Sequence, residues 1–196
     1  MFMVAILLLA VGTVPLAGGR LQKLATVRLR WAWTLPVALT IQILITTVVP
    51  NGPRTLHAAA HLVSYGFGAA FLVANRRFPG IGLLALGASL NLLAITANGG
   101  VMPADPDALR LAGWPVTSSD FENSTALAHP RLALLGDIVA IPRFVPLANV
   151  FSIGDILILL AGIWAIHSIC GSRLVPNSRR RSTGERRSQP PQRSSQ

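Results

Sequence analysis

The fold of this chain is decided by residues 152–171, which read SIGDILILLAGIWAIHSICG. After the aspartate at position 155, this stretch holds no Asp, Glu, Lys or Arg. A helix of about 20 predominantly apolar residues crosses a hydrocarbon core about 30 Å thick. Backbone polar groups in lipid must be hydrogen-bonded within their own segment, which favours a helix over an isolated strand. Residues 152–171 are therefore predicted to form a membrane-spanning helix.

The rest of the chain has the same character. Its 196 residues are 52% hydrophobic and 12% charged, whereas soluble domains are about 25% charged. Further apolar runs predict spans at roughly 1–17, 31–49, 56–74 and 81–97. We therefore predict an all-α integral membrane protein in which about five transmembrane helices occupy a helical domain over residues 1–172.

Most of the cations follow the first, third and fifth predicted spans, whereas Arg54, Arg110 and Arg131 fall in the connections assigned to the other side. The cations that follow these three spans are Arg20, Lys23, Arg28, Arg30, Arg76, Arg77, Arg173 and the arginines of the C-terminal tail. Cytoplasmic loops are enriched in Lys and Arg, so five spans with the N-terminus outside place all of these cations in the cytoplasm. The first span lacks the preceding cation of a signal peptide, so we expect it to be retained. The formal net charge of +10 is then explained by the enrichment of cations on the cytoplasmic side of the membrane. No nucleic-acid partner is expected.

Residues 132–149 interrupt this simple pattern. They combine apolar quartets with Asp137, Pro142, Arg143 and Pro146, and proline breaks a helix. A sixth full span would also place the arginine-rich tail outside. We predict an outer re-entrant or interfacial hairpin over 132–149, since broken backbone at membrane depth must be buried in protein or line a wet cavity.

The chain ends in a basic segment with few apolar residues, 173–196. Such a composition predicts a disordered cytoplasmic tail. Its arginines serve as a topology anchor or bind anionic lipids. The lone cysteine, Cys170, provides no disulfide or metal framework, and no cofactor is expected.

Two similar tripeptides, Gly136-Asp137-Ile138 and Gly154-Asp155-Ile156, place carboxylates in apolar surroundings. Ser152 stands three residues before Asp155, the spacing of a capping box, so a structural role for Asp155 is predicted. Asp137 has no such explanation. An ionisable residue in a membrane segment is a functional candidate, with Arg131 or Arg143 as its predicted partner. A proton-sharing pair of aspartates, as in aspartic proteases, is the enzymatic alternative.

Histidines and asparagines supply the remaining candidates. His57 and His61 are four residues apart, so both lie on one face of the third predicted span. Packing against a polar neighbour such as Asn91 is favoured over a metal site, because no third ligand is evident. Asn91 lies on the fourth span, and Asn98 at its end precedes a glycine pair that stops the helix. On the five-span topology, His57, Asn98, Asp137 and Asp155 converge at the outer side.

Three motifs carry a family resemblance. They are Asn98-Gly99-Gly100-Val101-Met102-Pro103, Leu135-Gly136-Asp137-Ile138 with Ile141-Pro142, and Phe151-Ser152-Ile153-Gly154-Asp155. Together they resemble a bacterial family of multi-pass membrane proteins known as domain of unknown function 5317, over residues 1–172. The resemblance implies the bacterial cytoplasmic membrane and no particular activity, so no catalytic residue is carried over.

These observations predict a non-enzymatic accessory, scaffold or small-solute-binding membrane protein. Its partners would be the bilayer and another membrane protein. The alternatives are a membrane-embedded hydrolase that uses Asp137 and Asp155, and a small transporter. The candidate functional cluster comprises Asp137, Asp155, Asn98, His57, His61, Asn91 and Arg143.

Overall fold

The computed structural model describes residues 2–49, 52–116 and 124–175, and most of these residues are helical. The long helices are α1 (Phe2–Leu16), α2 (Thr34–Ile43), α3 (Arg54–Ala74), α4 (Ile81–Ala97) and α6 (Ile153–Cys170). A 3₁₀ helix, η1 (Leu21–Thr26), follows α1, and α2 continues into a π-helical turn, η2 (Leu44–Val48). The predicted helical segments are therefore confirmed as helices.

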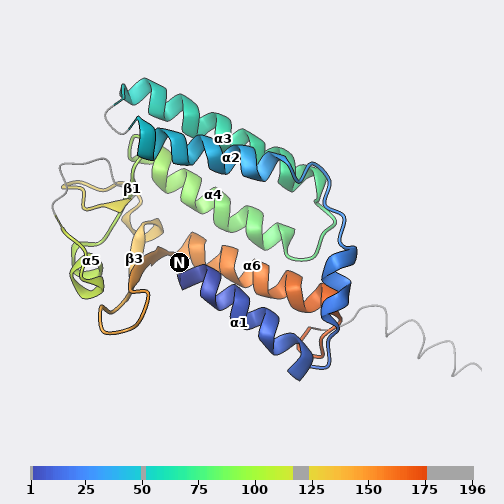
Figure 1. Ribbon diagram of the computed structural model, residues 1–196. Coiled ribbons are helices and arrows are strands. Elements are labelled where there is room, and N and C mark those ends of the chain that lie inside the picture. The colour runs from blue at the N-terminus through green and yellow to red at the C-terminus, as the bar shows by residue number, and fades with distance from the viewer. Residues whose placement is uncertain (1, 50–51, 117–123, 176–196) are drawn as a thin grey trace, which may run out of the picture.

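The five long helices lie side by side and run between the same two ends of the molecule (Figure 1). Helix α6 packs against α4 and α1, and α2 packs against α3. Helices α3 and α4 touch each other only sparsely. The bundle thus consists of two closely packed groups with a looser seam between α3 and α4.

One end of the bundle is tied together by hydrogen bonds between distant segments. Arg20 N donates to the carbonyl of Cys170, and Arg173 N donates to the carbonyl of Ala17. The backbone of Arg30 is bonded to the side chain of Asn75. These contacts gather the connection after α1, the turn after α3 and the end of α6, so the cations of these segments share one end.

The opposite end carries the short elements (Figure 1). They are β1 (Met102–Pro103), α5 (Pro106–Ala112), β2 (Ser124–Thr125), η3 (Ala133–Leu135), β3 (Asp137–Ile141) and β4 (Asn149–Ser152). Strands β1 and β2 are parallel, whereas β3 and β4 form an antiparallel pair. Helix α5 packs on this hairpin through a small core of Ala104, Ala108, Leu109, Ala112 and Val150.

The hairpin corrects the expectation of an all-α fold. Residues 132–149 do turn back on themselves, but they do so through β-strands, and a register shift lies between Asp137 and Val139. Short apolar runs do not distinguish a strand from a buried helix by pattern alone. Pro142 lies just beyond β3. Proline lacks a backbone N–H, and at this position the strand pairing does not need one.

Helix length does not support five spans. Among the described residues, α6 alone is long and apolar enough to cross a membrane, with 18 residues. Four other apolar helical stretches have 10–17 residues: Phe2–Leu16, Thr34–Ile43, Ala59–Ala74 and Ile81–Ala97. The second predicted span is shortened because its regular α-helix changes into the π-helical turn at Leu44.

Candidate functional site

The capping box predicted at the start of α6 is present and extends to a second helix. The backbone N–H of Asp155 donates to Ser152 Oγ (2.9 Å), and that of Ser152 donates to Asp155 Oδ2 (3.2 Å). Asn91 of α4 joins them, because its Nδ2 donates to Asp155 Oδ1 (2.8 Å) and its Oδ1 accepts from Ser152 Oγ (2.8 Å). Both oxygens of the Asp155 carboxylate therefore accept hydrogen bonds, so the carboxylate joins the start of α6 to α4.

Glycines allow this network to form. A Cβ on Gly154 would lie 2.6 Å from the carbonyl oxygen of Gly87 and would also strike the Asn91 amide. A Cβ on Gly87 would lie 2.5 Å from the carbonyl oxygen of Gly154. The backbones of α4 and α6 thus meet where Asn91 reaches Asp155, because two glycines leave no side chain between them.

In the first Gly-Asp pair, the glycine also allows a close approach of two backbone segments. A Cβ on Gly136 would collide with the carbonyl oxygen of Pro103 in β1. The next residue, Asp137, is 4% exposed, and its carbonyl accepts a hydrogen bond from Asp105 N (3.0 Å). In the hairpin, Asp137 is the partner of Ser152. This register places the first aspartate beside the cap that holds the second.

Both aspartates line one cavity of about 350 Å³, which we call the carboxylate cavity. Its polar lining residues are Gln42, His61, Tyr65, Asn91, Asp137 and Asp155. They come from α2, α3, α4, β3 and α6. Gln42 Nε2 donates to Ser64 Oγ (2.7 Å), which in turn donates to the carbonyl of His61 (2.8 Å). These bonds join α2 to α3 next to the cavity.

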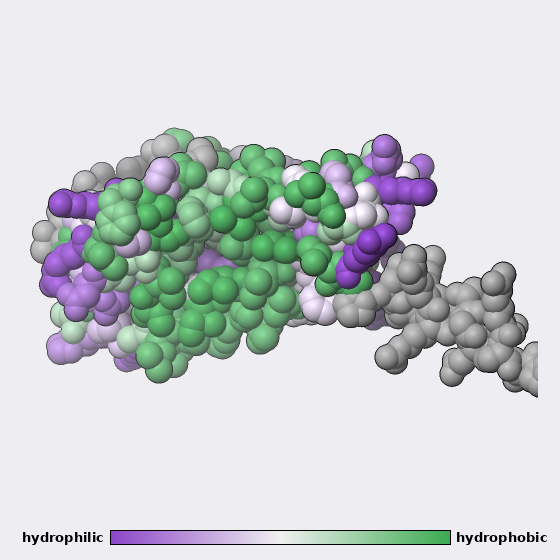
Figure 2. Space-filling view, turned by 90° about the horizontal axis from the view of Figure 1, so that it is seen from below, coloured by the Kyte–Doolittle hydropathy of each residue, from purple (hydrophilic) through white to green (hydrophobic). Residues whose placement is uncertain are grey.

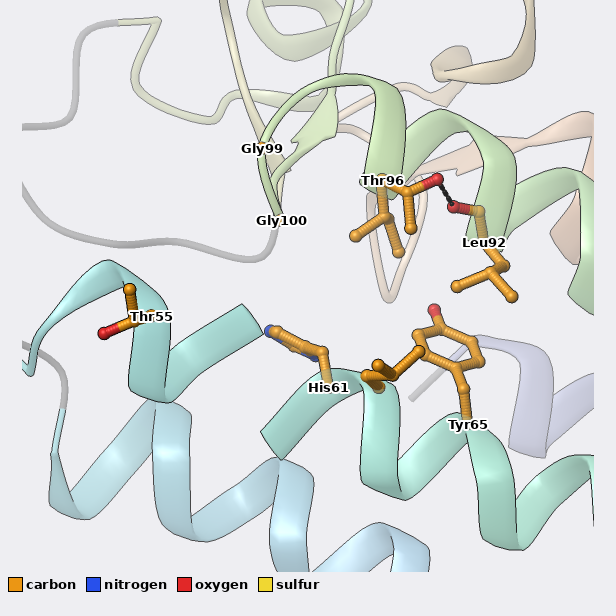
Figure 3. A pocket seen from close by; sticks show the side chains of 9 residues that line it. Thr55, His61, Tyr65, Leu92, Thr96, Gly99 and Gly100 are labelled. Carbon is orange, nitrogen blue, oxygen red and sulfur yellow. Dashed lines mark hydrogen bonds between the residues drawn. The ribbon is translucent and has the colours of Figure 1, made fainter. Parts of the chain in front are cut away.

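A second cavity of about 350 Å³ adjoins the first at His61 and Tyr65 and is mainly apolar. Figure 3 shows these two side chains on α3 and, across the seam, Leu92 and Thr96 on α4. The Thr96 hydroxyl donates to the carbonyl of Leu92 (2.7 Å) and so remains within its own helix. The two neighbouring cavities therefore lie where α3 and α4 are loosely packed.

The remaining sequence candidates lie elsewhere. Asn98 ties the end of α4 to the segment before η3: its Nδ2 donates to the carbonyls of Ala94 (2.7 Å) and Arg131 (2.8 Å), and its Oδ1 accepts from Arg131 N (2.8 Å). Arg143 lies against Gly113 at the end of α5 and does not line the carboxylate cavity. His57 is in the first turns of α3, but its side chain lies outside the described residues.

Sequence reasoning missed Gln42 and Tyr65. Gln42 stands inside an apolar run, and a polar side chain there was a signal for a site. Tyr65 follows His61 by four residues, so the helical period already placed it on the histidine's face. Within the described residues, no group of three or more His, Cys, Asp or Glu side chains is arranged to hold a metal ion.

Comparison with known proteins agrees with the motif resemblance. The sequence profile of a family of unknown function, DUF5317, matches residues 26–167. An uncharacterised protein of Thermotoga maritima is 35% identical over 92 residues, which make up 46% of this chain and 52% of that protein. The chain thus spans about half the length of this relative. No solved structure gives a significant match.

Proposed function

The chain belongs to the DUF5317 family, and we propose that it is a multi-pass protein of the bacterial cytoplasmic membrane that binds a small cationic solute in the carboxylate cavity. The observation that carries this proposal is a pair of carboxylates, Asp137 and Asp155, on one cavity whose described lining includes no Lys or Arg.

The surface of the bundle supports the membrane assignment. Large apolar side chains stand on the outside of all five long helices, and more than half of each is exposed: Leu8, Leu39, Leu62, Val73, Leu93 and Trp164. Figure 2 shows a broad hydrophobic zone with hydrophilic residues gathered towards the two ends. Soluble monomers rarely expose such continuous apolar area, whereas lipid tails solvate it at no cost.

The helices shorter than 18 residues are compatible with this proposal. At 1.5 Å per residue, the 15 residues of α1 and the 17 of α4 reach about 22–26 Å. Bilayers thin locally around short hydrophobic segments at a cost of fractions of a kcal/mol per Å. Helix α2 has 10 residues and continues into the five of η2, so a thinned bilayer around α1, α2 and α4 is compatible with several spans.

Charge separation supports the orientation. The segments that carry Arg20, Lys23, Arg28, Arg30, Arg76, Arg77 and Arg173 meet at one end, whereas the short elements at the other end carry Asp105, Asp107 and Asp137 beside Arg110, Arg131 and Arg143. By the positive-inside bias, the basic end faces the cytoplasm and the carboxylate cavity opens towards the outer side. The tail 176–196, where anionic lipid contacts were predicted, lies outside the described residues.

The chemistry of the carboxylate cavity favours a cation. Asp137 and Asp155 place two carboxylates on one cavity, and like charges that line one cleft create a potential that attracts a solute of opposite charge. Tyr65 adds an aromatic face, which attracts organic cations. The volume of about 350 Å³ falls in the range of about 300–1,000 Å³ that is typical of small-molecule sites.

The hydrolase alternative receives less support. A proton-sharing pair requires that one carboxyl be protonated at working pH. Asn91 and the Ser152 backbone already donate to the two oxygens of Asp155, so the capping role accounts for this carboxylate without a shared proton. Transport of the bound solute remains compatible with the site, because the seam between α3 and α4 is loosely packed.

The test is binding of choline to the purified full chain in detergent, compared with its neutral isostere 3,3-dimethyl-1-butanol. We expect choline alone to bind, and Asp137→Asn to weaken binding about tenfold or more, which corresponds to about 1.4 kcal/mol. Asp107→Asn is the matched control, because it removes the same charge at an exposed position on α5. Equal affinity for the two probes, or equal weakening by both substitutions, would refute the proposal.

A further inference from the structure

A second charged cavity lies at the basic end of the bundle. It has a volume of about 570 Å³ and is lined by Arg28, Arg30, Arg76 and Arg77, together with Trp31 and Phe78. We call it the arginine pocket. Its residues come from the connection before α2 and from the end of α3 with the turn that follows it. Arg30 and Asn75, which link these two segments, are 45 residues apart in the sequence.

Asn75 holds these two segments together. Its Oδ1 accepts from Arg30 N (2.9 Å), and its Nδ2 donates to the carbonyls of Arg30 (2.8 Å) and Phe71 (2.9 Å). Asn75 is buried, and its bond to the Phe71 carbonyl fixes the amide that holds Arg30. The position of Arg30 beside Arg76 and Arg77 is thus built into the fold.

Trp31 is held in an unusual conformation next to this contact. Its φ is 53°, in the left-handed region that bulky residues rarely adopt. Its carbonyl accepts from both the backbone N–H (3.0 Å) and the hydroxyl (2.8 Å) of the buried Thr34. Strained backbone persists only where its surroundings fix it, and it clusters at binding sites. Here it brings an indole to the wall of the arginine pocket.

The four guanidinium groups have no carboxylate among their described neighbours. The described acidic residues are Asp105, Asp107, Asp137 and Asp155, all in α5, β3, the start of α6 or the segments beside them, at the opposite end of the bundle. Clustered like charges repel one another. A topology signal needs cations only near the membrane face and does not require four of them around one cavity.

We propose that the arginine pocket binds a phosphate group, supplied by the headgroup of an anionic phospholipid. Arginine forms paired hydrogen bonds with phosphate oxygens, and basic pockets between helices on the cytoplasmic side suit anionic headgroups. The indole of Trp31 and the apolar Val73 and Phe78 give the same pocket a wall for the glycerol and upper acyl region. Tryptophan is enriched at that depth of the bilayer.

The experiment titrates the detergent-purified full chain with phosphatidylglycerol or phosphatidylcholine and counts bound lipid by native mass spectrometry. Phosphatidylglycerol should bind the wild type, and R76Q/R77Q should weaken it about tenfold or more. R20Q/K23Q is the matched control, because it removes two cations at the same end from outside the arginine pocket. It should change the affinity less than about twofold.

Three further arms make the outcome decisive. R28Q/R30Q should reproduce the loss from the other wall of the pocket, which guards against a folding defect in one variant. R76K/R77K should recover only part of the affinity, because lysine keeps the charge without the paired geometry. Inorganic phosphate is titrated by itself as the second probe: binding of phosphate without binding of phosphatidylglycerol would overturn the lipid proposal and assign the pocket to a soluble phosphate compound. Equal loss in R76Q/R77Q and R20Q/K23Q, or no binding of either probe, would overturn the proposal.

Discussion

Gly154→Ala is the sharpest test of the contact between α4 and α6. The added methyl group would lie 2.6 Å from the carbonyl oxygen of Gly87, whereas ordinary contacts begin at 3.4 Å. Either the helices separate by about 0.8 Å, which forfeits a quarter to a half of each dispersion contact between α4 and α6, or the backbone shifts locally. The same methyl group also displaces the Asn91 amide.

The cost follows from these two effects. Overpacking a well-filled contact costs about 1–3 kcal/mol. Loss of the hydrogen bonds from Asn91 to Asp155 and from Ser152 to Asn91 adds about 0.5–1.5 kcal/mol for each bond. Since an alanine also has a better helix propensity than glycine by about 0.8–1.0 kcal/mol, we expect a net destabilisation of about 1–5 kcal/mol. That corresponds to a fall in the melting temperature of roughly 2–20 °C for a chain of this size.

The assay is thermal unfolding of the full chain in a mild detergent, with Gly82→Ala as the matched control. Gly82 lies on α4, and a Cβ there would meet nothing within 4 Å, so that substitution should be neutral or stabilising by about 0.4–1 kcal/mol. In an Asn91→Ala background, Gly154→Ala should cost less, because one of its two obstacles is gone. If Gly154→Ala and Gly82→Ala give the same melting temperature, the proposed close approach of α4 and α6 is wrong.

Two further predictions concern the cap and the topology. Ser152→Ala removes the cap of α6 and the hydroxyl that donates to Asn91, so it should lower the free energy of unfolding by about 2–3 kcal/mol; a change below about 0.5 kcal/mol, the usual effect of a surface substitution, would contradict the buried network. Reporter fusions at the C-terminus and within 104–125 should report opposite sides of the membrane, with the C-terminus in the cytoplasm, whereas a C-terminus outside would refute the five-helix topology.

Much of the local structure followed from the sequence. The predicted range 81–97 coincides with α4, and the range 152–171 differs from α6 by one residue at each end. The capping box of Ser152 and Asp155 was also predictable. These features depend on residues only a few positions apart, so spacing along one helix is sufficient to find them.

The candidate site was only partly predictable. Asp137, Asp155, Asn91 and His61 were identified as candidates and do line one cavity, but Asn98 and Arg143 serve other contacts. The partner of Asp155 on α4 is 64 residues away. Hydrophobic periodicity describes windows of about 11–18 residues and therefore does not predict such a contact. Of the two arginines predicted as partners of Asp137, Arg143 lies against α5, where its backbone N–H donates to the carbonyl of Leu111.

The sequence by itself therefore determined which segments are apolar helices, where α6 is capped, and which end of the molecule is basic, because each depends on composition or on neighbours in the chain. Only the tertiary structure decided that both Gly-Asp pairs meet at one cavity and that four arginines surround another. These juxtapositions depend on the hairpin register between Asp137 and Ser152, the glycine contact of α4 with α6, and the Asn75 bonds to Arg30. Each joins segments that have no fixed distance until the helices pack.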